Sequence, residues 1–124
     1  MLELIQSNAE LVREIGRKML GREIAYDLDG VTWLDGFLQR QHEQGDPGLR
    51  DQLVSVCGSF LGECIVQSYG WSWTGDNGGW CVSKDQDNAA YPFAKVDKQL
   101  EFGSEDSVLS FFTTIPLVFA GSNH

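Results

Sequence analysis

Glu63 is the carboxylate whose sequence surroundings favour acid–base chemistry most. It lies in the apolar run GSFLGECIV, where only its helical-turn neighbours Ser59 and Gln67 continue a polar strip around it. A carboxyl group buried in such surroundings has a raised pKa and needs a hydrogen-bond partner. A raised pKa would suit a general acid or base. The alternative, which the sequence favours, is that the strip faces solvent or meets an Arg or Trp donor.

The remaining candidates for catalysis or metal binding are weaker. His124 is the last residue, and His42 falls at a predicted helix end, so neither is expected to serve as the base of a nucleophilic site. The run 85–88, Asp-Gln-Asp-Asn, has the early spacing of a calcium loop but lacks the following glycine and the distal glutamate. We therefore expect no catalytic residue, no metal and no other cofactor, and we predict that the protein is not an enzyme.

The cysteines are expected to be reduced and buried. Cys57 and Cys64 are seven residues apart on one predicted helix, which is about 10 Å at 1.5 Å per residue and too far for a disulfide. No CxxC spacing occurs, and neither histidine is close to a cysteine in sequence. Zinc binding or redox chemistry is the alternative interpretation.

Three of the four tryptophans fall in one short segment that alternates aromatic with small residues. Such alternation is typical of a strand and puts Trp71 and Trp73 on the same side. The Asn- and Gly-rich turn at 76–79 would return the chain as a second strand that carries Trp80. These rings either seal the sheet onto the core or form a protein-binding surface, because Trp is enriched at binding hot spots. On the second interpretation the partner-binding residues are Trp71, Trp73, Asp76, Trp80, Asp85 and Asp87.

The charge of the chain narrows the choice of partner. Eighteen acidic and nine basic residues give a net charge of −9. Such a field repels nucleic acid and anionic lipid and attracts proteins with a basic surface, although it also serves solubility. No apolar run reaches the ~18 residues of a membrane span, and the N-terminus has no signal-peptide pattern. We therefore expect a cytoplasmic protein that binds neither nucleic acid nor membrane, and a homodimer is compatible with these features.

The stretch 46–69 is predicted to be a central helix that positions all of these candidates. It is apolar over most of its girth, which is typical of a helix in the middle of a core. Asp46 and Pro47 suit its start, and Gly70 suits its end. Gly58 and Gly62 lie one turn apart, and each costs about 1 kcal/mol of helix propensity. We expect another element to pack closely against that bare strip.

The other elements follow from periodicity and turn residues. Helices are predicted over 3–20, 31–43, 93–102 and 108–115, the second with its cap at Asp29 or Thr32 and the last ending before Pro116. Residues 117–119 are expected to pack back onto the core. The sequence therefore predicts one α+β domain over 1–124, with about five helices around the central helix and a small three-stranded antiparallel sheet at 71–91.

Two runs carry a family resemblance: GSFLGECIVQSYGWSW, and YPFAKVDKQLEFGSEDSVLSFF. They resemble a group of small bacterial domains of unknown function, in which a G-x-x-L-G-E helix leads to a Gly/Trp strand and a P-F-x-K-V-x-K helix precedes an E/D-D-S helix. The likeness covers about residues 50–115. Its motifs look structural, and it implies no catalytic residue. It does imply a role, because proteins of this kind are often immunity proteins encoded beside toxins.

The expected function is therefore binding: an acidic cytosolic protein, of the immunity type, that docks on a basic toxin or effector and neutralises it. Two alternatives stay open. One is a small enzyme or ligand-binding domain that uses Glu63 and a tryptophan-lined pocket. The other is a structural subunit with a homodimer interface.

Overall fold

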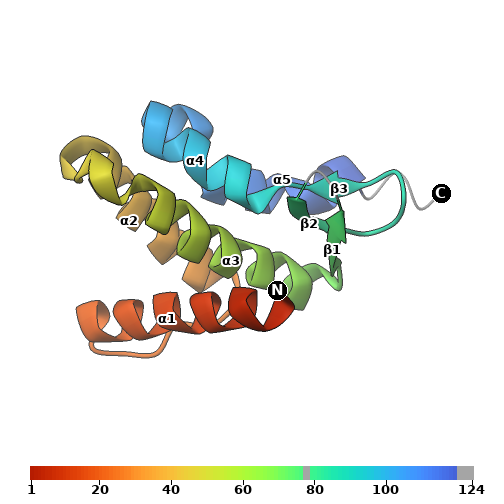
Figure 1. Ribbon diagram of the computed structural model, residues 1–124, viewed down its shortest axis with the longest axis horizontal. Helices are drawn as coiled ribbons and strands as arrows, with labels where there is room; N and C mark the ends of the chain where they lie inside the picture. The colour runs from red at the N-terminus through yellow and green to blue at the C-terminus, as the bar shows by residue number, and fades with distance from the viewer. Residues whose placement is uncertain (77–78, 120–124) are drawn as a thin grey trace.

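Helix α3 (Arg50–Tyr69) runs through the middle of the molecule, with α1 along one side of it and α4 along another (Figure 1). The computed structural model describes residues 1–76 and 79–119. Its elements follow the chain in this order: α1 (Leu2–Leu20), α2 (Leu28–Gln44), the 3-10 turn η1 (Pro47–Leu49), α3, β1 (Ser72–Asp76), β2 (Gly79–Ser83), β3 (Ala89–Ala90), α4 (Pro92–Phe102), the 3-10 turn η2 (Gly103–Asp106) and α5 (Val108–Phe119). The predicted α+β architecture is confirmed.

The central helix is buried as its composition predicts. Every residue from Cys57 to Ile65 is buried, so other elements cover α3 on all sides through its middle turns. Gly70 ends the helix with φ 74°, in the left-handed region that glycine adopts without strain. The start differs from the prediction, because Asp46 caps the η1 turn, where its Oδ1 accepts a hydrogen bond from the Gly48 N–H at 2.8 Å.

The glycine strip of α3 is a packing surface, as expected. A Cβ at Gly58 would lie 2.9 Å from the Cα of Phe93, and a Cβ at Gly62 would lie 2.1 Å from the Trp73 ring. Phe93 comes from α4 and Trp73 from β1, and their ring centroids are 5.9 Å apart. The missing side chains therefore let one helix and one strand approach α3 side by side.

The sheet has the predicted antiparallel order β1-β2-β3. Trp73 is paired with Val82 and Gly75 with Trp80, so these four residues share one face. Val82 also pairs with Ala90 of β3, and both are buried. This face, which carries Trp73, is the one that packs against α3.

Two predictions about helix ends were wrong. Helix α2 is capped by Asp27, whose Oδ1 accepts a hydrogen bond from the Gly30 N–H at 3.2 Å, rather than by Asp29 or Thr32. Helix α5 continues through Pro116 instead of ending before it. Proline has no N–H to donate to the carbonyl four residues earlier, and the Tyr69 hydroxyl donates to that Phe112 carbonyl at 2.9 Å in its place.

Leu117 and Val118, which follow Pro116, do not pack back onto the core. Leu117 is 79% exposed, and Val118 is also exposed. The expectation for 117–119 is therefore wrong at these two positions, and the side chain of Phe119 lies outside the described part.

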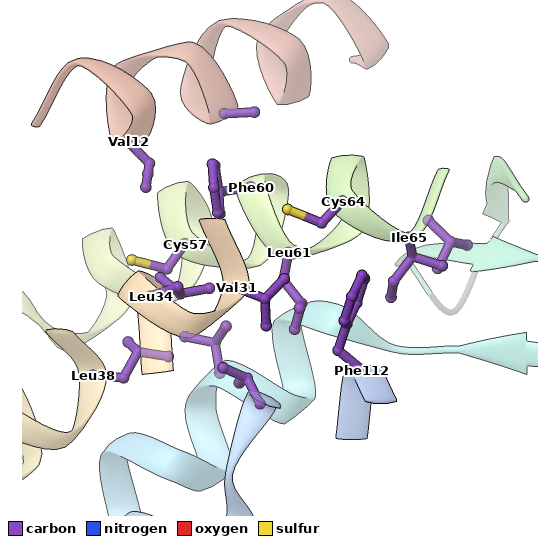
Figure 2. Packing of buried hydrophobic residues seen from close by; sticks show 14 of the residues in the cluster. Val12, Val31, Leu34, Leu38, Cys57, Phe60, Leu61, Cys64, Ile65 and Phe112 are labelled. Atoms are coloured by element: carbon purple, nitrogen blue, oxygen red, sulfur yellow. The ribbon is translucent and has the colours of Figure 1, made fainter. Parts of the chain in front are cut away.

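The core lies where α1, α2, α4 and α5 meet α3. Figure 2 shows Phe60, Leu61, Cys64 and Ile65 of α3 among side chains from the surrounding helices. The partners that it labels are Val12, Val31, Leu34, Leu38 and Phe112. Over the residues described, no helix is both long and apolar enough to cross a membrane.

The apolar stripe of α1 is wider than the core uses. Its core face consists of Ile5, Ala9, Val12 and Gly16. Leu4, Leu11 and Met19 continue the same apolar arc but are exposed, and Ile15 is half-buried. Seven apolar residues within one broad helical arc cannot all reach a single neighbouring helix, so part of the stripe is left outside.

Candidate protein-binding surfaces

The three tryptophans of the predicted site differ in how much they present to a partner. Trp71 is only 5% exposed and belongs to the core. Trp73 is half-buried over Gly62, and its Nε1 donates a hydrogen bond to Glu63 Oε2 at 2.7 Å. Trp80 is half-buried, and its ring lies over Gly75 across the hairpin. Trp73 therefore seals the sheet onto α3, whereas Trp80 is not among the described residues that pack against the core cluster.

Glu63 has the Trp donor that the sequence analysis favoured. The carboxylate is buried; besides the Trp73 bond, its Oε1 accepts a hydrogen bond from Gln67 Nε2 at 3.4 Å. Glu63 thus fixes the indole ring in the position that the glycine strip leaves open. This geometry accounts for a carboxylate in the middle of a buried helix without any substrate.

The turn between β2 and β3 is held by its own side chains. Asp85 Oδ1 accepts hydrogen bonds from the Asp87 backbone N–H at 2.9 Å and from Asn88 Nδ2 at 2.8 Å. These bonds stabilise the ionised form, first the one from the Asp87 N–H, and they lower the pKa of Asp85. The calcium-like spacing therefore has a structural explanation, that of an Asx-type turn. The described residues include no group of three or more His, Cys, Asp or Glu able to hold a metal ion.

The predicted acidic residues do not lie together. Asp85 and Asp87 follow the last residue of β2, whereas Asp76 is paired with Gly79, its first residue. The two positions are therefore at opposite ends of a five-residue strand, about 13 Å apart at 3.3 Å per residue. The Asp76 side chain and residues 77–78 lie outside the described residues. Of the predicted carboxylates, the structure brings only Asp85 and Asp87 together.

Cys57 and Cys64 are buried and form no disulfide, as predicted. Burial raises the pKa of the Cys57 thiol to about 12. Burial is also the main cause that raises the pKa of Cys64, with the nearby carboxylates of Asp27 and Glu63 adding to it. Both thiols are therefore protonated and unreactive at neutral pH.

The structure assembles a second acidic surface, which the sequence analysis missed. Here the end of α2 and the η1 turn meet the end of α4 and the η2 turn. His42 Nδ1 is 2.8 Å from the Leu100 carbonyl oxygen, and a Cβ at Gly103 would lie 2.8 Å from the His42 ring. Arg50 Nε donates to Asp97 Oδ1 at 2.8 Å, and Arg50 Nη1 donates to Glu101. These contacts join segments about fifty residues apart, and we call the surface of 41–51 and 97–105 the acidic end.

The acidic end combines negative charge with exposed apolar groups. Its six carboxylates are all exposed, against two cations in the same segments. One of these cations, Arg50, is held by two of the carboxylates. The other, Lys98, lines a separate hollow with Tyr91 and Phe111. The six carboxylates are Glu43, Asp46, Asp51, Asp97, Glu101 and Glu105.

Apolar groups and a small hollow lie on the same surface. Leu49 is 44% exposed and Phe102 is 56% exposed. A hollow of about 120 Å³ is lined by His42, Pro47, Arg50 and Leu100, among others. Its volume is enough for one side chain of a partner. Exposed aromatic and aliphatic groups beside unpaired carboxylates are a common composition for a protein-binding surface.

No local signal in the sequence marks this surface, because no stretch within it is unusual on its own. The comparisons with known proteins add no relative: no protein-family model, curated protein or solved structure matches the chain. The resemblance to small bacterial domains therefore stays a prediction.

Proposed function

We propose that the protein is an acidic binding domain that captures a protein with a basic surface and blocks it, as an immunity protein blocks a toxin. The observation that carries the proposal is the acidic end, whose two segments together hold six exposed carboxylates, the exposed Leu49 and Phe102, and a hollow. The carboxylates that form no ion pair within the described part of the chain attract a basic protein toward this surface, and the exposed apolar side chains then provide contacts for the bound protein.

The distribution of charge supports the same surface. Residues 1–26 contain four acidic and four basic residues, so the whole net charge of −9 falls in residues 27–124. The acidic end has six carboxylates and two cations, whereas the turn at 84–88 has Asp85 and Asp87 against Lys84. The acidic end therefore produces the stronger attraction for a basic protein.

The apolar anchors favour this placement as well. Trp71 is buried and Trp73 is bonded to Glu63, so among the predicted tryptophans only Trp80 remains as an anchor for the sheet surface. Both carboxylate oxygens of Glu63 accept hydrogen bonds from other side chains of the protein. No specific observation therefore favours the alternative, in which Glu63 serves a small enzyme.

The test begins with partner capture and with co-expression of the neighbouring gene's product, followed by binding kinetics at several salt concentrations. Steering by charge predicts an association rate that falls steeply from about 0.01 M to 0.15 M salt, where the Debye length drops from about 30 to about 8 Å. The dissociation rate should change less. An association rate that ignores salt would contradict the proposal.

Two matched variants locate the surface. The pair Glu43→Lys and Asp51→Lys changes the net charge as much as the pair Asp85→Lys and Asp87→Lys, and none of the four residues is in an ion pair among the described residues. We expect the first pair to slow association and the second to have a small effect. The reverse result would move the docking surface to the sheet turn and leave the binding function standing.

A further inference from the structure

Helix α1 carries an apolar seam that the fold does not cover. Leu4, Asn8, Leu11, Ile15 and Met19 are spaced by four, three, four and four residues, which places them on one side of the helix. Leu4, Leu11 and Met19 are 55%, 47% and 54% exposed. We call these five residues the α1 seam. It lies beside the core face of Ile5, Ala9, Val12 and Gly16 rather than within it.

The spacing of the seam is that of a helix pairing surface. Apolar residues at alternating steps of three and four form the contact line of two-stranded helix pairs, in which a single polar position such as Asn8 is commonly tolerated. Residues 4–15 follow this alternation, and Met19 lies one residue beyond the next step. Packing within the chain uses only part of this line: Ile15 also packs against the core, whereas Leu4, Leu11 and Met19 are exposed. A second helix can therefore lie along it.

Charge identifies the second helix as another copy of α1. A basic partner is drawn to residues 27–124, which hold the whole net charge of −9, whereas residues 1–26 are formally neutral. The α1 region is thus where two acidic copies can meet with the least repulsion. In this region the apolar seam lies on a helix whose segment, residues 1–26, has four acidic and four basic residues.

The charges along α1 also set the direction of pairing. Glu3 lies eight residues before Leu11, and Lys18 lies seven residues after it. Among the described residues Glu3 is in none of the ion pairs, and Lys18 is held only loosely by Glu14 at 3.8 Å, with both side chains exposed. In an antiparallel pair centred on Leu11, Glu3 of each copy faces Lys18 of the other. In a parallel pair like charges would face each other.

We propose that the protein forms a two-fold symmetric dimer through the α1 seam, with the two α1 helices antiparallel and Leu11 at the symmetry axis. Such an interface is isologous, so each substitution acts twice in the dimer. Leu4, Leu11 and Met19 are exposed in the monomer, which allows these three residues to be changed without disturbing the core.

The first test is the mass of the full chain by sedimentation equilibrium and light scattering, up to about 100 μM. The monomer mass is 13.8 kDa, and we expect twice this value at the higher concentrations. Leu11→Glu should weaken the dimer by about 100-fold or more, because two carboxylates meet at the axis. Leu117→Glu, at an exposed leucine of α5, is the matched control and should leave the mass unchanged.

Far-UV circular dichroism and thermal unfolding establish that both variants are folded. A wild-type protein that stays monomeric over the whole series would overturn the dimer. Equal loss of dimer in both variants, or no loss in Leu11→Glu, would overturn the assignment to the α1 seam.

The second test addresses direction. Glu3→Lys and Lys18→Glu should each weaken the dimer by on the order of tenfold, because the symmetry repeats each lost rim pair. A chain with both substitutions exchanges the two charges and should recover the wild-type dimer constant. If the double variant dimerises no better than the single variants, the antiparallel arrangement is wrong.

Discussion

Gly62 offers the sharpest test of how the sheet is attached to the central helix. A Cβ at this position would lie 2.1 Å from Cη2 and 2.2 Å from Cζ2 of Trp73. The ring cannot retreat freely, because its Nε1 is bonded to Glu63 at 2.7 Å and the neighbouring Phe93 ring packs against it. Even Gly62→Ala must therefore shift the indole, break the Glu63 bond or move β1 away from α3.

The expected cost can be bounded from two opposing effects. Overpacking in a well-packed core typically costs about 1–3 kcal/mol. Replacing a mid-helix glycine with alanine gains about 1 kcal/mol of helix propensity. We expect the first effect to win at Gly62, which leaves a net loss of up to about 2 kcal/mol for Gly62→Ala. Gly62→Leu should lose more because it adds a branched chain at the same point.

Gly36 is the matched control. It also lies within a helix, α2, but the nearest atom to a Cβ there is the end of the Arg40 side chain at 3.4 Å. Gly36→Ala should therefore gain up to about 1 kcal/mol. Both variants add one methyl group within a helix, but the methyl group meets the Trp73 ring at Gly62 and has room at Gly36.

Urea unfolding, followed by tryptophan fluorescence and circular dichroism, provides the measurement. With a slope of about 1–3 kcal/mol per molar urea, a loss of about 2 kcal/mol moves the midpoint down by about 0.7 M or more. If Gly62→Ala is stabilised as much as Gly36→Ala, the strip of α3 does not contact the Trp73 ring. The account of how the sheet is attached would then be wrong.

Three further predictions concern bonds and thiols of the core. Trp73→Phe leaves the Glu63 carboxylate without its shortest donor, and we expect a loss of about 2 kcal/mol or more in urea unfolding. Tyr69→Phe orphans the Phe112 carbonyl, at a cost of about 1–2 kcal/mol that should shrink in a Pro116→Ala background, where an N–H becomes available; equal costs in both backgrounds would contradict this role. The buried cysteines should react slowly with a thiol reagent in native protein and completely after denaturation, and stoichiometric zinc in the purified protein would contradict the assignment of free thiols.

The parts of the fold that were predictable are those in which local pattern and tertiary environment agree. The middle of α3 is apolar all round, and burial on all sides is what such a helix requires. The two glycines within it indicated close approach, and Phe93 and Trp73 supply it. A polar residue in that setting needed a donor, which the nearest Trp strand provides.

The failures have tertiary causes. Nothing local to Pro116 indicates that α5 continues, because the donor that replaces its N–H comes from Tyr69, at the end of another helix. Periodicity in α1 separates apolar from polar residues but does not distinguish the arc that meets α3 from the arc beside it. The expected cap of α2 was misplaced by two or more residues because Asp27, Asp29 and Thr32 are all competent caps by type.

The candidate site depended even more on contacts distant in sequence. The tryptophans were visible as a pattern, yet how far each ring is buried depends on contacts distant in sequence: Trp71 belongs to the core, and Trp73 lies over Gly62 of α3. The acidic end was invisible, since Arg50 joins Asp97 and Glu101 across about fifty residues and no stretch of either segment stands out in composition.

The α1 seam and the acidic end share no residue, and this separates the two proposals experimentally. The seam belongs to α1, whereas the acidic end is built from α2, η1, α4, η2 and the start of α3. Leu11→Glu should therefore leave the salt dependence of partner association unchanged, and the pair Glu43→Lys and Asp51→Lys should leave the dimer constant nearly unchanged. A dimer would also present two acidic ends, so binding to an immobilised partner should weaken in Leu11→Glu through lost avidity while the one-to-one association rate in solution stays the same. If that solution rate falls as well, α1 takes part in partner binding, and the charge-based division of the surface into a self-pairing and a partner-binding region is wrong.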